Sequence, residues 1–184
     1  MTTSLPTALV LASGRGERFL ASGGRTHKLR ALLSGKAVLD HVLDAVRASG
    51  LPWHLEDAGH PGMGDSIAAA VHATPSEVGW LILPGDLPLI QPATLQQMAL
   101  ALVQADGRAE VIVPVHQGQR GHPVAFAAAC RQALRELRGD RGAAAVIRAW
   151  RAIEMIVDDI GCVTDVDTVQ ALAQAQAVLD ARPF

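Results

Sequence analysis

Residues 8–19 read ALVLASGRGERF, an apolar run that ends on a loop with two glycines and two arginines. Ligands of open α/β sheets bind beyond the carboxyl ends of the strands, which is where a loop after this apolar run would lie. Gly14 and Gly16 allow backbone N–H groups to approach an anion closely. Arg15 and Arg18 add positive charge. The stretch therefore predicts a buried strand that delivers a phosphate-binding loop.

The spacing of this loop matches neither of the two common phosphate-binding fingerprints. It reads GxGxxR, because Phe19 follows Arg18, whereas the dinucleotide fingerprint is GxGxxG and the P-loop is GxxxxGK[ST]. Lys28 lies downstream and can supply a further positive charge. The alternative interpretation is an ordinary strand-to-helix turn with arginines that face solvent.

Strand-like and helix-like segments alternate along the rest of the chain, which predicts an α/β fold around a mainly parallel sheet. A helix is predicted over 37–50 with Gly50 as its C-cap, and another over 64–74 with Asp65 or Ser66 as its N-cap. Further helices are predicted at 92–106, in two segments separated by RGDRG (138–142), and at 168–181. Further strands are predicted at 79–86, 109–115, 152–161 and 162–167.

The overall composition favours one compact domain spanning residues 1–184 and excludes several classes of protein. A formal net charge of -2 gives no general attraction to nucleic acid or to a membrane surface, so anion recognition has to be local. The two cysteines, Cys130 and Cys162, are far apart and have no CxxC spacing, which favours a reduced protein over a disulfide framework or a zinc site. Without a signal-like first segment, we expect a cytoplasmic protein.

Two aspartates follow predicted strands and are candidate metal ligands. Asp86 ends the apolar run 79–86, so its carboxylate reaches the sheet edge that carries the glycine loop, where Mg²⁺ could bridge it to phosphate oxygens. Asp167 follows a late strand and is a candidate second ligand. The alternatives are a turn carboxylate for Asp86 and a helix N-cap for Asp167. His122, in the sequence GHP, is either close to a second substrate or a surface loop residue.

Six segments occur in the order seen in the MobA-like nucleotidyltransferases. They are LVLASGRGERF…HKLRALLSGKAVLDHVLDAV, GMGDSIAAAV, LILPGDLPLI, RGHPVAF, LRGDRGAAAVI and TDVDTVQAL. The chain resembles this family over almost its whole length, and GMGDS, PGDLPL, RGHPV and GDRG resemble its molybdenum cofactor cytidylyltransferase branch. The resemblance implies a Rossmann-like three-layer sandwich of the nucleotide-diphospho-sugar transferase type. It also implies transfer of a nucleoside monophosphate from a nucleoside triphosphate (NTP), with CTP favoured, to the phosphate of molybdenum cofactor (molybdopterin), which releases pyrophosphate.

The resemblance assigns roles to the matching residues. Arg18, Lys28 and Asp86 are the implied catalytic residues, and Asp86 and Asp167 are the implied ligands of Mg²⁺. The implied substrate-binding residues are Ser13, Gly14, Arg15, Gly16, Gly62, Met63, Gly64, Ser66 and His122.

Three features depart from the family pattern. Ser13 gives LASG where LAAG or LAGG is usual, and the loop between Arg18 and Lys28 is long. The segment 51–61, LPWHLEDAGHP, is too short for the strand, helix and strand expected there. One βα unit is therefore predicted to be missing.

Three other functions stay open. A molybdenum cofactor guanylyltransferase would differ in its base, and a sugar-phosphate nucleotidyltransferase would differ in its acceptor pocket, against which RGHP and GDRG argue. A catalytically silent nucleotide-binding or chaperone-like module is a third, against which Lys28 and Asp86 argue. Transient contact with a molybdoenzyme or its maturation chaperone is a further partner hypothesis.

Overall fold

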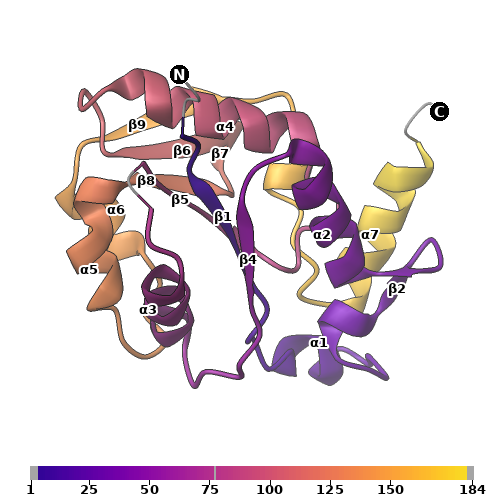
Figure 1. Ribbon diagram of the computed structural model, residues 1–184. Coiled ribbons are helices and arrows are strands. Elements are labelled where there is room, and N and C mark those ends of the chain that lie inside the picture. The colour runs from indigo at the N-terminus through magenta and orange to yellow at the C-terminus, as the bar shows by residue number, and fades with distance from the viewer. Residues whose placement is uncertain (1–3, 77, 182–184) are drawn as a thin grey trace.

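The computed structural model describes residues 4–76 and 78–181 and contains a seven-stranded mixed sheet (Figure 1). The strands run in the order β4-β1-β5-β8-β6-β7, and β9 pairs with the other side of β6. Strands β4, β1 and β5 are parallel, β8 is antiparallel to both β5 and β6, and β9 is parallel to β6. The strand bounds are β1 Thr7–Leu11, β4 Trp53–Glu56, β5 Gly79–Pro84, β6 Val111–His116, β7 Gln119–Arg120, β8 Val124–Ala127 and β9 Ala152–Ile156.

Helices cover both faces of this sheet, so the predicted fold class is confirmed (Figure 1). One face carries α2 (Val38–Ser49) and α4 (Pro92–Ala105), and the other carries α3 (Met63–Ala73), α5 (Arg131–Arg135) and α6 (Ala144–Ala149). Side chains of a strand alternate between its faces, and the pattern of β1 follows this rule. Ala8 and Val10 pack in the core under α2 and α4, whereas Leu9 and Leu11 pack in the core under α3.

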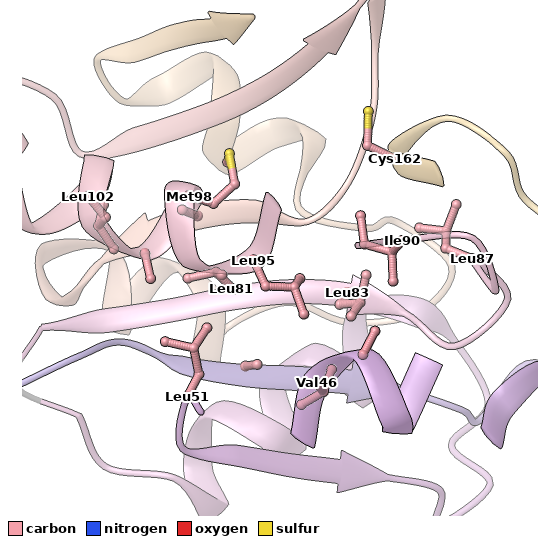
Figure 2. Close-up of a cluster of buried hydrophobic side chains, with 14 of the residues drawn as sticks. Val46, Leu51, Leu81, Leu83, Leu87, Ile90, Leu95, Met98, Leu102 and Cys162 are labelled. Carbon is pink, nitrogen blue, oxygen red and sulfur yellow. The ribbon is translucent and has the colours of Figure 1, made fainter. Parts of the chain in front are cut away.

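Figure 2 shows the first of these cores, in which Leu95 and Met98 of α4 lie over Leu81 and Leu83 of β5. All four side chains are fully buried. Full burial of one such side chain stabilises the fold by about 1.5–3 kcal/mol. This core therefore fixes β5, whose carboxyl end carries Asp86.

A third hydrophobic cluster lies beside α2, where α1 (Glu17–Ala21) and α7 (Val169–Asp180) pack together. It buries Phe19 of α1 and Ala175 of α7 around Leu33 of the small hairpin of β2 (Leu32–Leu33) and β3 (Lys36–Ala37). Short 3₁₀ helices at Lys28–Arg30, Ala128–Cys130 and Ile160–Cys162 complete the described elements. No helix among the described residues is both long enough and apolar enough to cross a bilayer.

The short segment before α3 contains a single strand, as its length predicts. β4 is followed by residues 57–62, which form no helix, and α3 begins directly afterwards. The sheet consequently ends at β4 on this side.

Three details of the predicted secondary structure are wrong. The N-cap of α3 is Gly62 instead of Asp65 or Ser66, because the Asp65 carboxylate accepts a hydrogen bond from Gly139 N. Residues 162–167 form no strand, since Cys162 belongs to a 3₁₀ turn that the Asp159 carboxylate caps. The alanine-rich stretch after residue 123 looks helical, but its first part is β8, because β5 and β6 both pair with it.

Candidate active site

A cavity of about 430 Å³ opens at the carboxyl ends of β1 and β5, and most of the predicted site residues line it. Gly64 does not line it, and His122 lines a neighbouring cavity instead. The predicted residues that line it are Ser13, Gly14, Arg15, Gly16, Arg18, Lys28, Gly62, Met63, Ser66, Asp86 and Asp167.

The glycine loop is held from two sides. Ser13 Oγ donates to the backbone oxygen of Glu56 at 3.3 Å, so the hydroxyl that departs from the family pattern joins β1 to β4. On the other side, His27 Nε2 lies 2.6 Å from the Gly14 carbonyl oxygen. Gly16 has a φ of 67°, and a Cβ there would lie 3.1 Å from the His27 ring. Glycine is therefore favoured at 16 both by its backbone conformation and by the close ring.

Lys28 joins the two predicted metal ligands. Its Nζ donates to Asp86 Oδ2 and to Asp167 Oδ1, each at 2.5 Å. Arg18 Nη1 lies 2.7 Å from the other oxygen of Asp167. The Lys28, Asp86 and Asp167 side chains are only 12%, 14% and 18% exposed, whereas Arg18 is 80% exposed. Lys28 is thus the enclosed cation of the site and Arg18 the exposed one.

The charges of this cluster shift each other's titration. Burial lowers the pKa of Lys28, but Asp86 and Asp167 raise it by more, so that pKa lies above its ordinary value. Burial raises the pKa of Asp167, but Lys28 and Arg18 lower it by more. Burial also raises the pKa of Asp165, as do the charges of Asp167 and Asp86. Unlike Asp167, Asp165 therefore has no cation among the described residues that lowers its pKa.

Asp86 and Asp167 fit a divalent cation. Both carboxylates touch the same Nζ atom, so one cation can reach both of them. Asp86 Oδ1 is buried and has no hydrogen-bond partner among the described residues. Those residues contain no group of three or more His, Cys, Asp or Glu that could hold a metal. One or two carboxylates with substrate phosphates are the usual ligands of Mg²⁺, so the pair suits a metal that arrives with a nucleotide.

The alternative structural roles of the two aspartates do not apply. The N-cap of α7 is Thr168, whose side chain accepts from Ala171 N, so Asp167 is not the cap. The Asp86 side chain is bonded to Lys28 instead of capping its own turn.

A second cavity of about 320 Å³ adjoins the first and is lined mainly by apolar side chains. The two cavities share Leu11, Met63 and Pro84. His122 lines the second cavity, and burial lowers its pKa although the charge of Asp86 opposes this. The structure therefore places His122 next to the first cavity without bringing it into the glycine-loop cluster.

The GMGDS (62–66) and GDRG (139–142) segments are held together by contacts of their backbones, an arrangement that we call the glycine clasp. Gly64 N donates to Gly139 O at 2.8 Å, and a Cβ on Gly62 would lie 2.2 Å from the Gly139 carbonyl carbon. A Cβ on Gly64 would lie 2.7 Å from the Arg141 carbonyl oxygen, so glycine at 64 is needed for packing although it does not line the cavity. Beyond the clasp, Asp140 lines the first cavity and Gly142 the second.

Sequence reasoning missed five polar residues at or around the cavity. Glu17, His60 and Asp140 line it, and His60 Nε2 lies 3.0 Å from the buried Glu56 carboxylate. Asp165 and His27 do not line the cavity. Asp165 interacts with the charges of Asp86 and Asp167, and His27 contacts the Gly14 carbonyl oxygen. Asp165 lies in the recognised TDVD segment and His27 directly precedes Lys28, so both were close to a signal. Asp140 lies in the recognised GDRG segment, so it too was close to a signal, whereas no spacing rule points to His60.

A glycine loop, a largely enclosed lysine and paired carboxylates at the carboxyl edge of a mainly parallel sheet suit a protein that binds and transfers phosphate groups, as a nucleotidyltransferase does. The family model described as the MobA-like NTP transferase domain matches residues 44–155, and the chain belongs to this family.

The chain is also similar to individual proteins. The chain is 31% identical over 121 residues to the bifunctional protein GlmU of Alkalilimnicola ehrlichii, a match that covers 54% of this chain and 25% of the relative. The chain thus spans about a quarter of the length of this curated relative. In structure, it is similar to Rv0371c from Mycobacterium tuberculosis H37Rv, with a TM-score of 0.74, 24% identity and coverage of 95% and 99%. It is also similar to molybdopterin-guanine dinucleotide biosynthesis protein A from Archaeoglobus fulgidus, with a TM-score of 0.70, 16% identity and coverage of 96% and 100%. The two structural likenesses establish the fold.

Proposed function

We propose that this protein transfers a cytidylyl group from CTP to the terminal phosphate of molybdenum cofactor and releases pyrophosphate, with Mg²⁺ as the metal. The observation that carries the transferase part is the Lys28 bridge between Asp86 and Asp167 beside the glycine loop. The choice of base and acceptor rests on the resemblance of GMGDS, PGDLPL, RGHPV and GDRG to the cytidylyltransferase branch.

In this proposal the glycine loop and the two cations bind the triphosphate. The backbone N–H groups around Gly14 and Gly16, together with Arg18 and Lys28, offset the charge that builds on the departing pyrophosphate. Mg²⁺ held by Asp86 and Asp167 would supply positive charge at the phosphate under attack. Gly62, Met63 and Ser66 would wall the base and ribose, since they line the other side of the same cavity.

The acceptor needs no catalytic base. A phosphate monoester is already a nucleophile near neutral pH, so the protein has to align it with the α-phosphorus and stabilise charge. The two cavities share lining residues, so an acceptor in the second cavity would lie next to a nucleotide in the first. His122 would contact this acceptor.

A sugar-phosphate nucleotidyltransferase is the second candidate, and the similarity to GlmU favours it. The lining of the second cavity argues against a sugar. Phe126, Ile82, Val113 and Ile147 contribute to it, and they offer few partners for hydroxyl groups. The faces of the flat ring system of a pterin could pack against these apolar side chains.

The deciding experiment measures pyrophosphate release with CTP, GTP, UTP and ATP, each with molybdenum cofactor or with a sugar 1-phosphate. We expect kcat/KM for CTP to exceed that for GTP by at least about tenfold with the same acceptor. A clear preference for GTP would reject the cytidylyltransferase assignment and leave the transferase assignment standing. Turnover with the sugar phosphate alone would establish the second candidate. Failure of every combination would favour a catalytically silent module.

A further inference from the structure

The imidazole of His27 joins the two parts of the phosphate site. Its Nε2 lies 2.6 Å from Gly14 O in the glycine loop. Its Nδ1 accepts a hydrogen bond from Leu29 N at 3.3 Å and caps the 3₁₀ turn that carries Lys28. His27 itself does not line the cavity.

These two contacts require one tautomer of the ring. Because Nδ1 accepts from an N–H group, the proton is on Nε2, and Nε2 donates to the Gly14 carbonyl. Neutral histidine satisfies both contacts at once.

The position of the Gly14 carbonyl determines what the loop presents to a ligand. In a trans peptide the C=O of one residue and the N–H of the next point in opposite directions. The bond to His27 directs the Gly14 oxygen toward a side chain outside the cavity lining, so the Arg15 N–H is directed to the opposite side. A flipped peptide would present a carbonyl oxygen to the ligand and repel phosphate.

The bond from His27 also spans the long connection between the loop and Lys28. α1 ends at Ala21, and Gly24 N donates to Phe19 O, which closes the first turn after the helix. After that turn, the bond from His27 returns the chain to Gly14. The long segment that the sequence shows between Arg18 and Lys28 is therefore closed by a side chain.

We infer that His27 is a positioning residue that holds the Gly14–Arg15 peptide in its anion-binding orientation and in register with Lys28. The inference rests on the proposed binding of NTP at this site.

Three variants separate the two bonds of the ring. His27→Gln keeps a donor at the position of Nε2 and loses the cap. His27→Asn keeps an acceptor at the position of Nδ1 and therefore keeps the cap, since asparagine is a good N-cap residue. Its side chain is too short to reach Gly14, so the bond to the loop is lost. His27→Ala loses both bonds. The matched control is His41→Asn, because His41 Nε2 makes a similar contact to Leu33 O, at 2.8 Å and away from both cavities.

The measurements are hydrogen–deuterium exchange of peptides covering residues 13–18, and the dissociation constant of magnesium–CTP. We expect faster exchange in His27→Ala and His27→Asn, and affinity weaker by roughly two- to tenfold, the value of one neutral hydrogen bond. His27→Gln and His41→Asn should resemble the wild type in both measurements. Similar thermal midpoints for the Asn and Gln variants would show that the effect is local.

Wild-type exchange in His27→Asn would overturn the inference, and so would equal acceleration in the Gln and Asn variants. If the wild type binds neither magnesium–CTP nor magnesium–GTP, the proposed function fails. The exchange measurement still decides whether His27 holds the loop.

Discussion

Replacement of Asp86 by Asn tests the centre of the proposed site, because it removes one charge and keeps the shape of the side chain. Asp86 Oδ2 contacts Lys28 at 2.5 Å, and its Oδ1 is buried without a partner among the described residues. The backbone around it is held independently, since Gly85 N donates to Leu11 O and Val166 N donates to Asp86 O, each at 2.9 Å. We therefore expect the variant to fold.

The change in stability is the difference between two opposing effects. A hydrogen bond to a charged group contributes about 1.5–3 kcal/mol, but Lys28 retains its bond to Asp167 in the variant. Loss of the charge also removes the repulsion between Asp86 and Asp165. Burial is the largest cause of the raised pKa of Asp165, followed by the charges of Asp167 and Asp86. We expect the free energy of unfolding to change by less than about 1.5 kcal/mol.

Turnover should fall far more than stability. Removal of one preorganised charged group typically costs about 3–4 kcal/mol of transition-state stabilisation, which is a loss of roughly 10²–10³ in kcat. Pyrophosphate release at saturating magnesium–CTP measures this loss, and urea unfolding measures stability. Asp44→Asn is the matched control, because Asp44 pairs with Lys36 and Arg47 and lies outside both cavities. Unchanged Mg²⁺-dependent activity in Asp86→Asn would remove this residue from the site.

Three further predictions follow from the same cluster and from the glycine clasp. Lys28→Ala and Arg18→Ala should each lose about 2–4 kcal/mol of transition-state stabilisation. The loss should be larger for Lys28, because its side chain is enclosed. A rise in KM without a fall in kcat would indicate that the side chain contributes to ground-state binding only. The pKa of Asp167 is below its ordinary value of 3.8 in the folded protein, so its contribution to stability is present above pH 3.8 and is lost as the pH falls through the folded pKa. Urea unfolding should therefore show a stability difference between the wild type and Asp167→Asn that is largest near neutral pH and shrinks in acid; a constant difference would contradict the pairing. Gly62→Ala should lower the free energy of unfolding by about 1–3 kcal/mol, because the added Cβ would meet backbone atoms of Gly139; unchanged urea unfolding would contradict the clasp.

The phosphate-binding side of the site could be predicted because it follows from the order of the strands. β1 and β5 are parallel neighbours, so the glycine loop after one and Asp86 after the other meet at the same sheet edge. Asp167 arrives at the same place for a different reason. Its predicted strand does not form, but Val166 N bonds to Asp86 O and fixes the segment there.

The base and acceptor side depends on contacts between distant segments, which no local pattern encodes. The clasp joins Gly64 to Gly139, and β8 forms only because two other strands pair with it. The same limit applies to His27, because its partner Gly14 lies 13 residues earlier in the sequence, before α1. Local pattern predicts which strand ends carry functional groups, whereas tertiary contacts decide how a pocket is walled.

The balance of charge in the cluster gives an independent reason to expect a metal with the nucleotide. Among the described residues of the ion-paired cluster, Asp86, Asp165 and Asp167 face Lys28 and Arg18, so the ionised cluster carries excess negative charge. Arg15, which also lines the cavity, is paired with Glu17. A free triphosphate is itself an anion, and the site attracts it weakly on charge alone. A divalent cation held by these carboxylates would reverse this balance and would give the buried Oδ1 of Asp86 a partner. The same cation would compete with Lys28 for both carboxylates, which would free the ammonium group to contact the phosphates.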